Sequence, residues 1–397
     1  MTISTNLQEN VVQRAAVTLR EKGSLLKGVA MDASPDPGNL GQSVTIGVHV
    51  KGTAGDVTPS AGNGPSTSED SFSGKLVTLD TWKNMPVTID ADSLATNNLT
   101  YNLGQAIDNA VGSVINAISE SLSGLNYLIP YTAGTAGRSL FNNGTIASVD
   151  TLADVSTVLN NNLVPDFGQR QCIVSTTEAG NYRKVTSVQN ANQMGSDMVR
   201  RTGLLGMDGG FELAYDQRIK SHTVGTITTG LIAKAATAVA AGVTSFIATT
   251  AASTGAVALK KGDIISIAHA SGAKTYSVQA DVTQASAATD TAAITLDRGL
   301  EYALIGSEAV TIATGFGTGT QNIAGDMRGY GLFNRIPAAQ LGGMTALRDP
   351  MVITDPVTGL SLLMGWYGQN ARTVWEVSAM YGVNVVQSDL LVRAQGA

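Results

Sequence analysis

Cysteine is almost absent from this sequence, since Cys172 is the only one. A single cysteine excludes a disulfide within one chain, so the cross-linked frameworks of small secreted proteins do not apply. Cys172 stands in the run QCIVS, whose apolar pattern predicts a buried strand. We therefore interpret its thiol as an inert side chain of the core.

Charged residues are also scarce, at 14% of the 397 residues, and the formal net charge is −6. Because there is no basic tract, sequence-specific recognition of nucleic acid has little support, although an inner surface could still face DNA. Low charge with 44 glycines is typical of sheet-rich packing or of surfaces buried against other chains. The length predicts two or three domains.

Long hydrophobic runs are missing as well. No run approaches the roughly 18 apolar residues that a membrane helix needs, and the N-terminal residues contain no continuous apolar segment of a signal peptide. We therefore expect no membrane partner, and a protein that is made and kept in the cytoplasm.

Residue patterns that support enzyme chemistry are lacking. His49, His222 and His269 stand apart without the spacing of metal ligands, so structural or surface roles are expected. A GxSxG motif is absent, and the glycines from Gly315 to Gly319 do not complete a dinucleotide loop, which favours a hinge. The sequence therefore predicts no enzyme, no catalytic residue, no cofactor and no metal.

Two further groups of residues have a structural interpretation that we prefer to a ligand site. Paired acids in loops are interpreted as solvated carboxylates rather than calcium ligands. Aromatic residues near the C-terminal end are interpreted as core or interface side chains. The acids are Asp32, Asp36, Glu69 and Asp70, and the aromatic residues are Trp366, Tyr367, Trp375 and Tyr381.

The longest regular pattern runs from Leu99 to Gly124 and predicts an amphipathic helix on the order of 35 Å long. Gly104 and Gly112 each cost roughly 1 kcal/mol of helix propensity, so close packing of neighbours must hold this helix. Its polar face includes Asn109, Ser113 and Glu120. Its apolar face consists of Leu103, Ala106, Ile107, Ala110, Val111, Val114, Ile115, Ile118, Leu122 and Leu125.

A two-stranded arm is predicted before this helix. The run from Ser43 to Lys51 alternates apolar and polar residues, and the run from Lys75 to Ile89 also reads as strand. The 23 residues between them, 52–74, are nearly all small, polar or acidic. Because an isolated hairpin is marginally stable, we expect the arm to lie on a neighbouring subunit, which would order its tip. The expected contact residues are Lys51, Lys75, Trp82 and Lys83.

Shorter elements are predicted on both sides of these features. The N-terminal end predicts a helix over Asn6–Lys22 and an extended, turn-rich connector over 31–41. Beyond the long helix, the pattern predicts a second helix over Ser148–Leu163, a buried strand over Gln171–Ser175, helical turns over Thr176–Val199 and a glycine-broken loop over Val199–Phe211.

From about Thr226 to Thr314 the composition shifts to Ala, Thr, Val and Gly, with short β-patterned runs such as DIISIAH and AAITLD. Their spacing predicts an inserted, autonomous antiparallel barrel or sandwich. After it, residues 355–368 read as a hairpin with Thr358-Gly359 at the turn. The terminal run EVSAMYGVNVVQSDLLVRA reads as a strand pair or a bent strand.

In its order of parts the chain resembles the major capsid proteins of tailed bacteriophages, which have the Hong Kong ninety-seven type fold. The inserted barrel is similar to that of the coat proteins of short-tailed Salmonella phages. Three segments carry the local resemblance: TLDTWKNMPVTIDADSLATNNLTYNLGQAI, TGAVALKKGDIISIA and MYGVNVVQSDLLVRA. The type member of that fold cross-links itself through a lysine and an asparagine, but no motif here identifies a partner for Lys51, Lys75 or Lys83.

This resemblance implies an α+β fold with an N-terminal arm (1–35), an E-loop hairpin (36–90) and a peripheral domain (91–165) that contains the long spine helix 99–124. It further implies an axial domain in two parts (166–225 and 326–397) that flank an inserted small antiparallel β-barrel (226–325).

The implied function is that of a structural protein whose copies assemble, as hexamers and pentamers, into an icosahedral capsid. The implied partners are other copies of the chain, a scaffolding protein in the procapsid, a portal protein and packaged double-stranded DNA that is not read by sequence. The implied location is the virion capsid, assembled in the host cytoplasm. The alternative is a β-rich tail component or adhesin, which predicts trimers or fibres, and an enzyme of another type comes third.

Overall fold

The computed structural model describes residues 25–49, 72–90, 99–135, 138–141, 150–165, 170–189, 199, 205–227, 231–233, 238–250, 257–284, 291–338, 347–355, 359–369 and 372–396. Three sequence expectations lie outside these residues: the helix over Asn6–Lys22, Lys51 and most of the polar tip at 52–74. The chain forms two compact units. Unit 1 includes Ala30–Val114 and Tyr330–Gln387, and unit 2 includes Glu21–Val29, Ile115–Gly329 and Ser388–Ala397.

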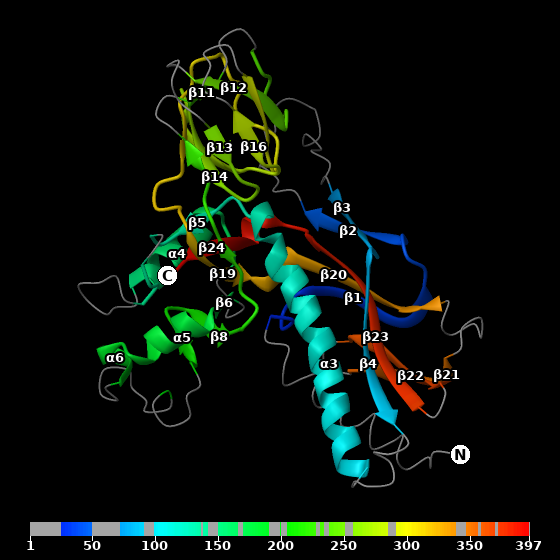
Figure 1. Ribbon diagram of the computed structural model, residues 1–397. Helices are drawn as coiled ribbons and strands as arrows, with labels where there is room; N and C mark the ends of the chain where they lie inside the picture. Colours follow the sequence, from blue (N-terminus) through cyan, green and yellow to red (C-terminus); the bar gives the residue numbers. More distant parts are fainter. Residues whose placement is uncertain are drawn as a thin grey trace, which may run out of the picture. The chain divides into compact units, whose positions relative to one another are not determined.

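The predicted long helix is confirmed as α3, Leu99–Ser123, which Figure 1 shows as one continuous helix. Its predicted apolar face is buried at Ile107, Ala110, Val111, Val114, Ile115, Ile118 and Leu122. Gly104 and Gly112 are buried too, whereas Asn109, Ser113 and Glu120 are exposed. Small residues at buried helix positions allow close packing, which offsets their poor helix propensity. A short 3-10 helix, η2 (Gly124–Leu128), follows.

Unit 1 is built on a six-stranded sheet around the long strand β23, Arg372–Val385. One edge of β23 pairs with β20 (Tyr330–Pro337) and then with β22 (Ser361–Gln369), and the other edge pairs with β4 (Thr81–Asp90). The β4 pairing runs from Thr81 opposite Tyr381 to Asp90 opposite Arg372. Trp375 and Tyr381 are buried in this sheet, as predicted, while Trp366 and Tyr367 are partly buried.

Strand β1, Ala30–Gly38, agrees with the extended backbone expected over 31–41 but corrects the expectation that this segment is a turn-rich connector. It pairs in parallel with β20 at the end of the sheet, and the register shifts between Ala33 and Pro37. Proline cannot donate a ladder hydrogen bond, so it is tolerated on an edge strand and at a bulge, and β1 combines both. Asp32 of this strand forms an ion pair of 2.9 Å with Arg335 on β20.

Two other expectations about hairpins are corrected in part. The predicted 355–368 hairpin has its turn in the expected place, because the Gly359 N–H donates to the Asp355 carbonyl. Its first strand, however, lies upstream as β21 (Arg348–Thr354), which pairs with β22. The predicted 75–89 strand is two strands, β3 (Phe72–Thr78) and β4, because the chain leaves the hairpin at Leu79 and Asp80 and enters the large sheet.

Unit 2 contains a seven-stranded sheet in the order β5-β24-β19-β6-β8-β7, with β9 also paired to β19. Its predicted buried strand is confirmed as β6, where Cys172 is fully buried. The predicted second helix and helical turns are confirmed as α4, α5 and α6 within the described residues. The bounds are β5 Thr132–Ala133, α4 Asp150–Asn161, β6 Arg170–Val174, α5 Thr176–Arg183, α6 Thr186–Gln189, β7 Met207–Asp208, β8 Phe211–Tyr215, β9 Ser221–His222, β19 Gly319–Asp326, η3 Met327–Gly329, η4 Ser388–Leu390 and β24 Leu391–Gln395.

The last two strands correct the expectation for the C-terminal run. β23 and β24 do not pair with each other, because β23 belongs to the sheet of unit 1 and β24 pairs with β19 and β5 in unit 2. β24 pairs with strands that are distant in the sequence, and β23 pairs with the distant β4 and β20 as well as with the neighbouring β22, so a local pattern does not reveal the separation of the two strands.

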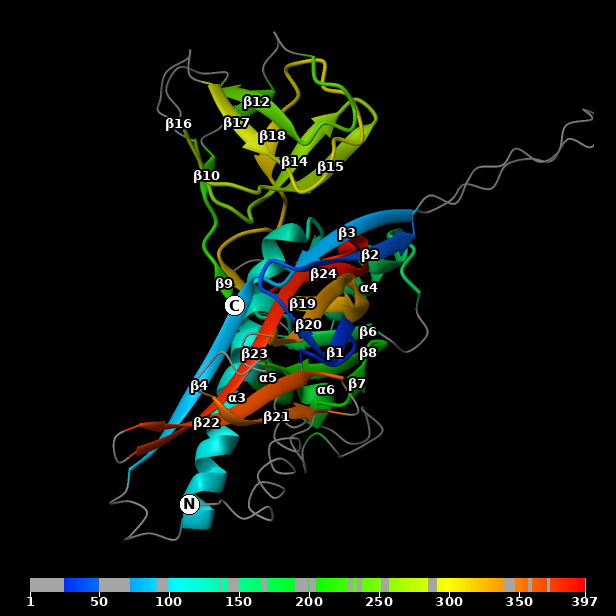
Figure 2. The same cartoon turned by 90° about the vertical axis from the view of Figure 1, so that its right-hand side faces the viewer.

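Figure 2 shows the strands of the β-rich insertion, which form three three-stranded sheets within the described residues. Buried side chains from these sheets form one hydrophobic core. Phe246, Ile265, Tyr276 and Ile294 are among its buried residues. Its strands are β10 Thr226–Ile227, β11 Leu231–Ala233, β12 Ser245–Thr250, β13 Val257–Leu259, β14 Ile264–His269, β15 Gly272–Ser277, β16 Val282–Gln284, β17 Thr291–Thr295 and β18 Val310–Ile312.

Candidate assembly surface

The predicted arm begins as the hairpin of β2, Ser43–His49, and β3, in antiparallel register from Ser43 opposite Thr78 to His49 opposite Phe72. Its near end is anchored in unit 1. Val77 and Leu79 are buried in one apolar cluster with Phe333 and Met380, and Val44 and Ile46 pack against that cluster. The near end of the arm is therefore supported by its own chain, contrary to the expectation that all of it needs a neighbour.

Close backbone approach fixes this anchor. A Cβ atom on Gly331 would lie 2.5 Å from Cγ2 of Val386 and 2.9 Å from Cδ1 of Ile46. The side-chain amide of Asn384 donates a hydrogen bond of 2.8 Å to the Leu76 carbonyl. The hairpin is thus held to the large sheet by packing and by a polar contact.

Large apolar side chains are exposed near the hairpin and on β4. Leu76 is 55% exposed, Trp82 41% and Met85 39%. Trp82 and Met85 are separated by an odd number of positions, so they lie on opposite faces of the strand. Residues 82–86 are all exposed, and among the described strands only β23 pairs with β4. This stretch offers both faces and one free edge to a partner.

The predicted contact residues are placed on two different strands. Lys75 lies on β3 opposite Ile46, whereas Trp82 and Lys83 lie on β4 opposite Met380 and Ala379. All three are exposed. Sequence reasoning missed Leu76 and Met85, although the alternation that buries Val77 already directs Leu76 outward.

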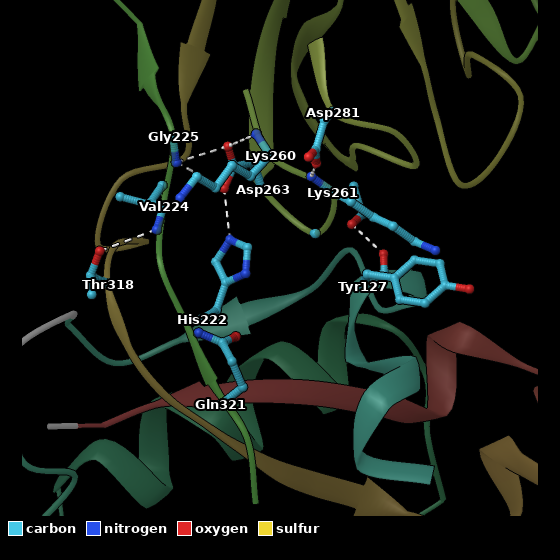
Figure 3. A network of polar contacts seen from close by, with 12 residues as sticks. Tyr127, His222, Val224, Gly225, Lys260, Lys261, Asp263, Asp281, Thr318 and Gln321 are labelled. Atoms are coloured by element: carbon cyan, nitrogen blue, oxygen red, sulfur yellow. Dashed lines mark hydrogen bonds and ion pairs between the residues drawn. The ribbon is translucent and has the colours of Figure 1, made fainter. Parts of the chain in front are cut away.

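A polar network joins the insertion to the rest of unit 2 (Figure 3). The carboxylate of Asp263 is fully buried and accepts hydrogen bonds from the backbone N–H of Gly225 at 3.1 Å and of Lys260 at 2.8 Å. Nε2 of His222, on β9, lies 2.7 Å from Oδ1 of Asp263. The Asp263 carboxylate thereby binds both the segment that enters the insertion, at Gly225, and the turn before β14, at Lys260.

A second set of contacts fixes the same junction. The hydroxyl of Ser277 and the side-chain amide of Gln279 donate to the Tyr127 carbonyl. Arg393 is buried and donates to the carbonyls of Ile129 and Gly262, each at 2.6 Å, and to the Ser277 hydroxyl at 2.9 Å. These contacts join β15, η2 and β24, so the insertion is attached at several points besides its two connections.

Cys172 and His269 are buried, and His222 is engaged by Asp263. Burial, with a smaller effect of Glu178, raises the pKa of the Cys172 thiol to about 12, so the thiolate is disfavoured, in line with the predicted core role. His269 is buried beside Tyr276 and Tyr302. The described residues contain no group of three or more His, Cys, Asp or Glu side chains that could hold a metal ion.

No protein-family profile matches the chain, and no curated protein matches it. The chain is similar to several solved structures. The capsid of the cyanophage P-SCSP1u is 10% identical, with a TM-score of 0.46 over 93% of this chain and 86% of that one. The mature capsid of bacteriophage PhiM1 is 13% identical, with a TM-score of 0.45 over 94% and 87%. A virus-like particle from Pyrococcus furiosus is 8% identical, with a TM-score of 0.40 over 98% of both chains.

Within the described part of the chain, no helix has the length and apolar character needed to span a membrane.

Proposed function

We propose that this chain is the major capsid protein of a tailed bacteriophage and that its copies assemble into an icosahedral shell around double-stranded DNA. The observation that carries the proposal is the exposed stretch of β4 beside the anchored hairpin. Trp82 and Met85 expose apolar surface on opposite faces of a strand whose outer edge has no partner among the described residues. A surface of this kind is suited to contact other chains.

The order of the described elements supports the same proposal. A hairpin, a long amphipathic helix, a mixed sheet with helices and a β-rich insertion follow one another as in the capsid fold that the sequence resembles. In this proposal β2 and β3 form the E-loop, α3 is the spine helix, and the insertion is a barrel within the axial domain. The protein acts as a non-enzymatic structural subunit, and its partners are further copies, a scaffolding protein, a portal protein and DNA bound without sequence recognition.

Many weak contacts made at once give high avidity, so assembly is expected to depend steeply on protein concentration. The direct test is electron microscopy of the full chain purified after coexpression with its scaffolding protein. Closed, roughly spherical shells are expected. Trimers or fibres would instead favour a tail component or adhesin, and the absence of any particle would contradict the capsid proposal.

A deletion tests the role of the arm. His49 and Phe72 are opposite partners at the last described pair of the hairpin, so residues 50–71 can be replaced by a two-residue Asn-Gly turn that keeps the register. The variant is expected to stay folded and to form no shells. Shells indistinguishable from those of the intact chain would contradict the proposed role of the arm.

Point variants test the exposed strand. The double variant Trp82→Ser and Met85→Ser is expected to keep its thermal midpoint but lose assembly, because neither side chain is buried in the subunit. The control is Met207→Ser, which alters an even more exposed apolar residue in unit 2 and should assemble normally. Equal assembly of both variants would show that β4 is not part of the assembly surface.

A further inference from the structure

A hollow of about 270 Å³ lies in unit 2, next to the junction with the insertion. The residues that matter for its chemistry are Ser123, Lys220, His222, Lys261, Gln321 and Arg393, all of which line it. They come from the end of α3, from β9 and the residue before it, from the turn before β14, and from β19 and β24. Five separate segments thus bring polar groups to one place.

The charge of this lining is the opposite of that of the whole chain. Lys220, Lys261 and Arg393 carry positive charges, His222 adds an imidazole, and no Asp or Glu lines the hollow. The whole chain has a formal net charge of −6. The acids nearby are already engaged: Asp263 with His222, Asp281 with the backbone of Lys261, and Glu120 with Lys220.

The two lysines are the groups available to a ligand. The Lys220 ammonium lies 3.4 Å from Glu120, but both side chains are about half exposed, so this ion pair is weak and a ligand can compete for the ammonium. The Lys261 ammonium lies 3.7 Å from the centre of the Tyr127 ring, which fixes its position without neutralising it. Arg393 donates its hydrogen bonds to other groups of the protein, so it contributes positive charge to the hollow rather than a donor to the ligand.

An independent observation points to a ligand that accepts hydrogen bonds. Gln321 is 3% exposed, and its side-chain Nε2 has no hydrogen-bond partner, while its Oε1 accepts from Gln395. A buried amide donor without an acceptor costs free energy, which a bound oxyanion or water would recover. The lining of the hollow therefore contains an unused donor as well as an excess of positive charge.

We propose that this hollow binds a phosphate group, with Lys220 and Lys261 as the principal contacts. A tetrahedral phosphate has several acceptor oxygens, and the residues that line the hollow supply several donors from separate segments. The volume suits a single phosphate group or a small phosphate ester better than a larger ligand. The phosphate can come from a free phosphate compound or from a nucleic-acid backbone, and the site is independent of the proposed shell assembly.

The test uses the full, unassembled chain and titration calorimetry with inorganic phosphate, at an ionic strength kept constant with sodium chloride. Lys261→Gln and Lys220→Gln are each expected to weaken binding at least about tenfold, because each removes a charged hydrogen bond. Lys260→Gln is the matched control, since it removes the same charge one position away, outside the lining. Its affinity should equal that of the unaltered chain.

A second experiment distinguishes the two sources of the phosphate group. A short single-stranded oligothymidylate that displaces phosphate identifies a nucleic-acid backbone as the ligand, and failure to displace it identifies a free phosphate compound. Three results would overturn the proposal. The first is no heat of binding at 10 mM phosphate, which is on the order of the weakest useful affinity, and the second is an equal loss of affinity in Lys260→Gln and Lys261→Gln. The third is tighter binding of polyglutamate than of phosphate, which would identify a site for acidic peptides.

Discussion

Nε2 of His222 lies 2.7 Å from Oδ1 of Asp263, and this contact joins strand β9 to the turn that opens β14 in the insertion. The carboxylate also receives the backbone N–H groups of Gly225 and Lys260. A fully buried charge is tolerated because all these donors converge on it. The Asp263 carboxylate is thus one of several points at which the insertion is attached, beside the contacts of Ser277 and Gln279 with Tyr127 and those of Arg393.

Asp263→Ala is expected to lower the free energy of unfolding by about 3 kcal/mol, because it leaves the buried N–H of Gly225 and the partly buried N–H of Lys260 without an acceptor. His222→Gln should lower the free energy of unfolding by clearly less, since the Asp263 carboxylate keeps its backbone N–H donors. Chemical denaturation of the full chain measures both. Asp281→Ala is the control, because Asp281 is exposed and its carboxylate accepts a backbone hydrogen bond, from Lys261, in the same turn. A loss as large in the control would contradict the central role of Asp263.

Gly225→Ala is expected to destabilise the chain by more than about 2 kcal/mol, because the new methyl group would clash with backbone atoms. Backbone atoms move less readily than side chains to relieve such a clash. The new Cβ would lie 2.0 Å from the Ala258 carbonyl oxygen. Gly180 in α5 is the control, since a Cβ there meets nothing within 4 Å. Gly180→Ala should stabilise by about 0.5 to 1 kcal/mol. Thermal melts that rank the two variants in the reverse order would show that the junction tolerates a side chain.

Ile115→Asp is expected to prevent stable folding, at a cost of about 3 to 5 kcal/mol, because it places an unpaired carboxylate at a fully buried position of α3. Glu120→Lys, on the exposed face of the same helix, should change stability by no more than about 0.5 kcal/mol. Circular dichroism and solubility distinguish the two results. A folded Ile115→Asp chain would mean that the wrong face of α3 has been assigned to the core.

The stability of the insertion is expected to fall as the pH drops below about 6.5, the ordinary histidine pKa. Burial lowers the pKa of His269, while Glu308 and Glu301 oppose this effect and Lys274 adds to it. A histidine whose folded pKa is lowered binds its proton more readily when unfolded, so acid favours unfolding. Denaturation midpoints between pH 7.5 and 5.5 measure the effect.

The matched variant for this titration is His269→Phe, which keeps an aromatic ring between Tyr276 and Tyr302. Because phenylalanine has no proton to bind, its midpoint should fall less over the same pH interval. Equal pH dependence in the two proteins would show that other groups, such as the carboxylates, cause the loss.

Helix α3 and the strands of the insertion could be predicted because their signals are local. The spacing of Ile107, Val111, Val114 and Ile118 fixes a buried helix face without reference to any other segment. The alternation in β2 and around Cys172 in β6 works in the same way. Where the spacing of apolar residues and the intrinsic propensity of the residues favour the same secondary structure, the prediction from the sequence agrees with the structure.

The missed elements depend on distant partners. β1 contains Pro35 and Pro37, which argue locally for a turn, and only its parallel pairing with β20 makes it a strand. The separation of β23 from β24 has the same origin, since each is chosen by a partner far away in the chain. Local patterns carry no information about such pairings.

The candidate sites divide in the same manner. Lys75, Trp82 and Lys83 are exposed, as a polar arm suggests, but their roles as contacts remain predictions. The contact of His222 with Asp263 could not be predicted, because the two residues are 41 positions apart and neither belongs to a motif. The cationic hollow arises only when Lys220 and Lys261 are brought together by the same junction.

The place of β24 in its sheet affects the timing of folding during synthesis. β24 follows every other strand of its sheet in chain order. In the sheet, however, it is an interior strand, between β5 and β19. While the ribosome is still translating the preceding residues, the facing edges of β5 and β19 are open, and β19 can pair only with β6 and β9. Closure of this sheet therefore awaits the synthesis of β24, which follows all the other strands of the sheet in chain order.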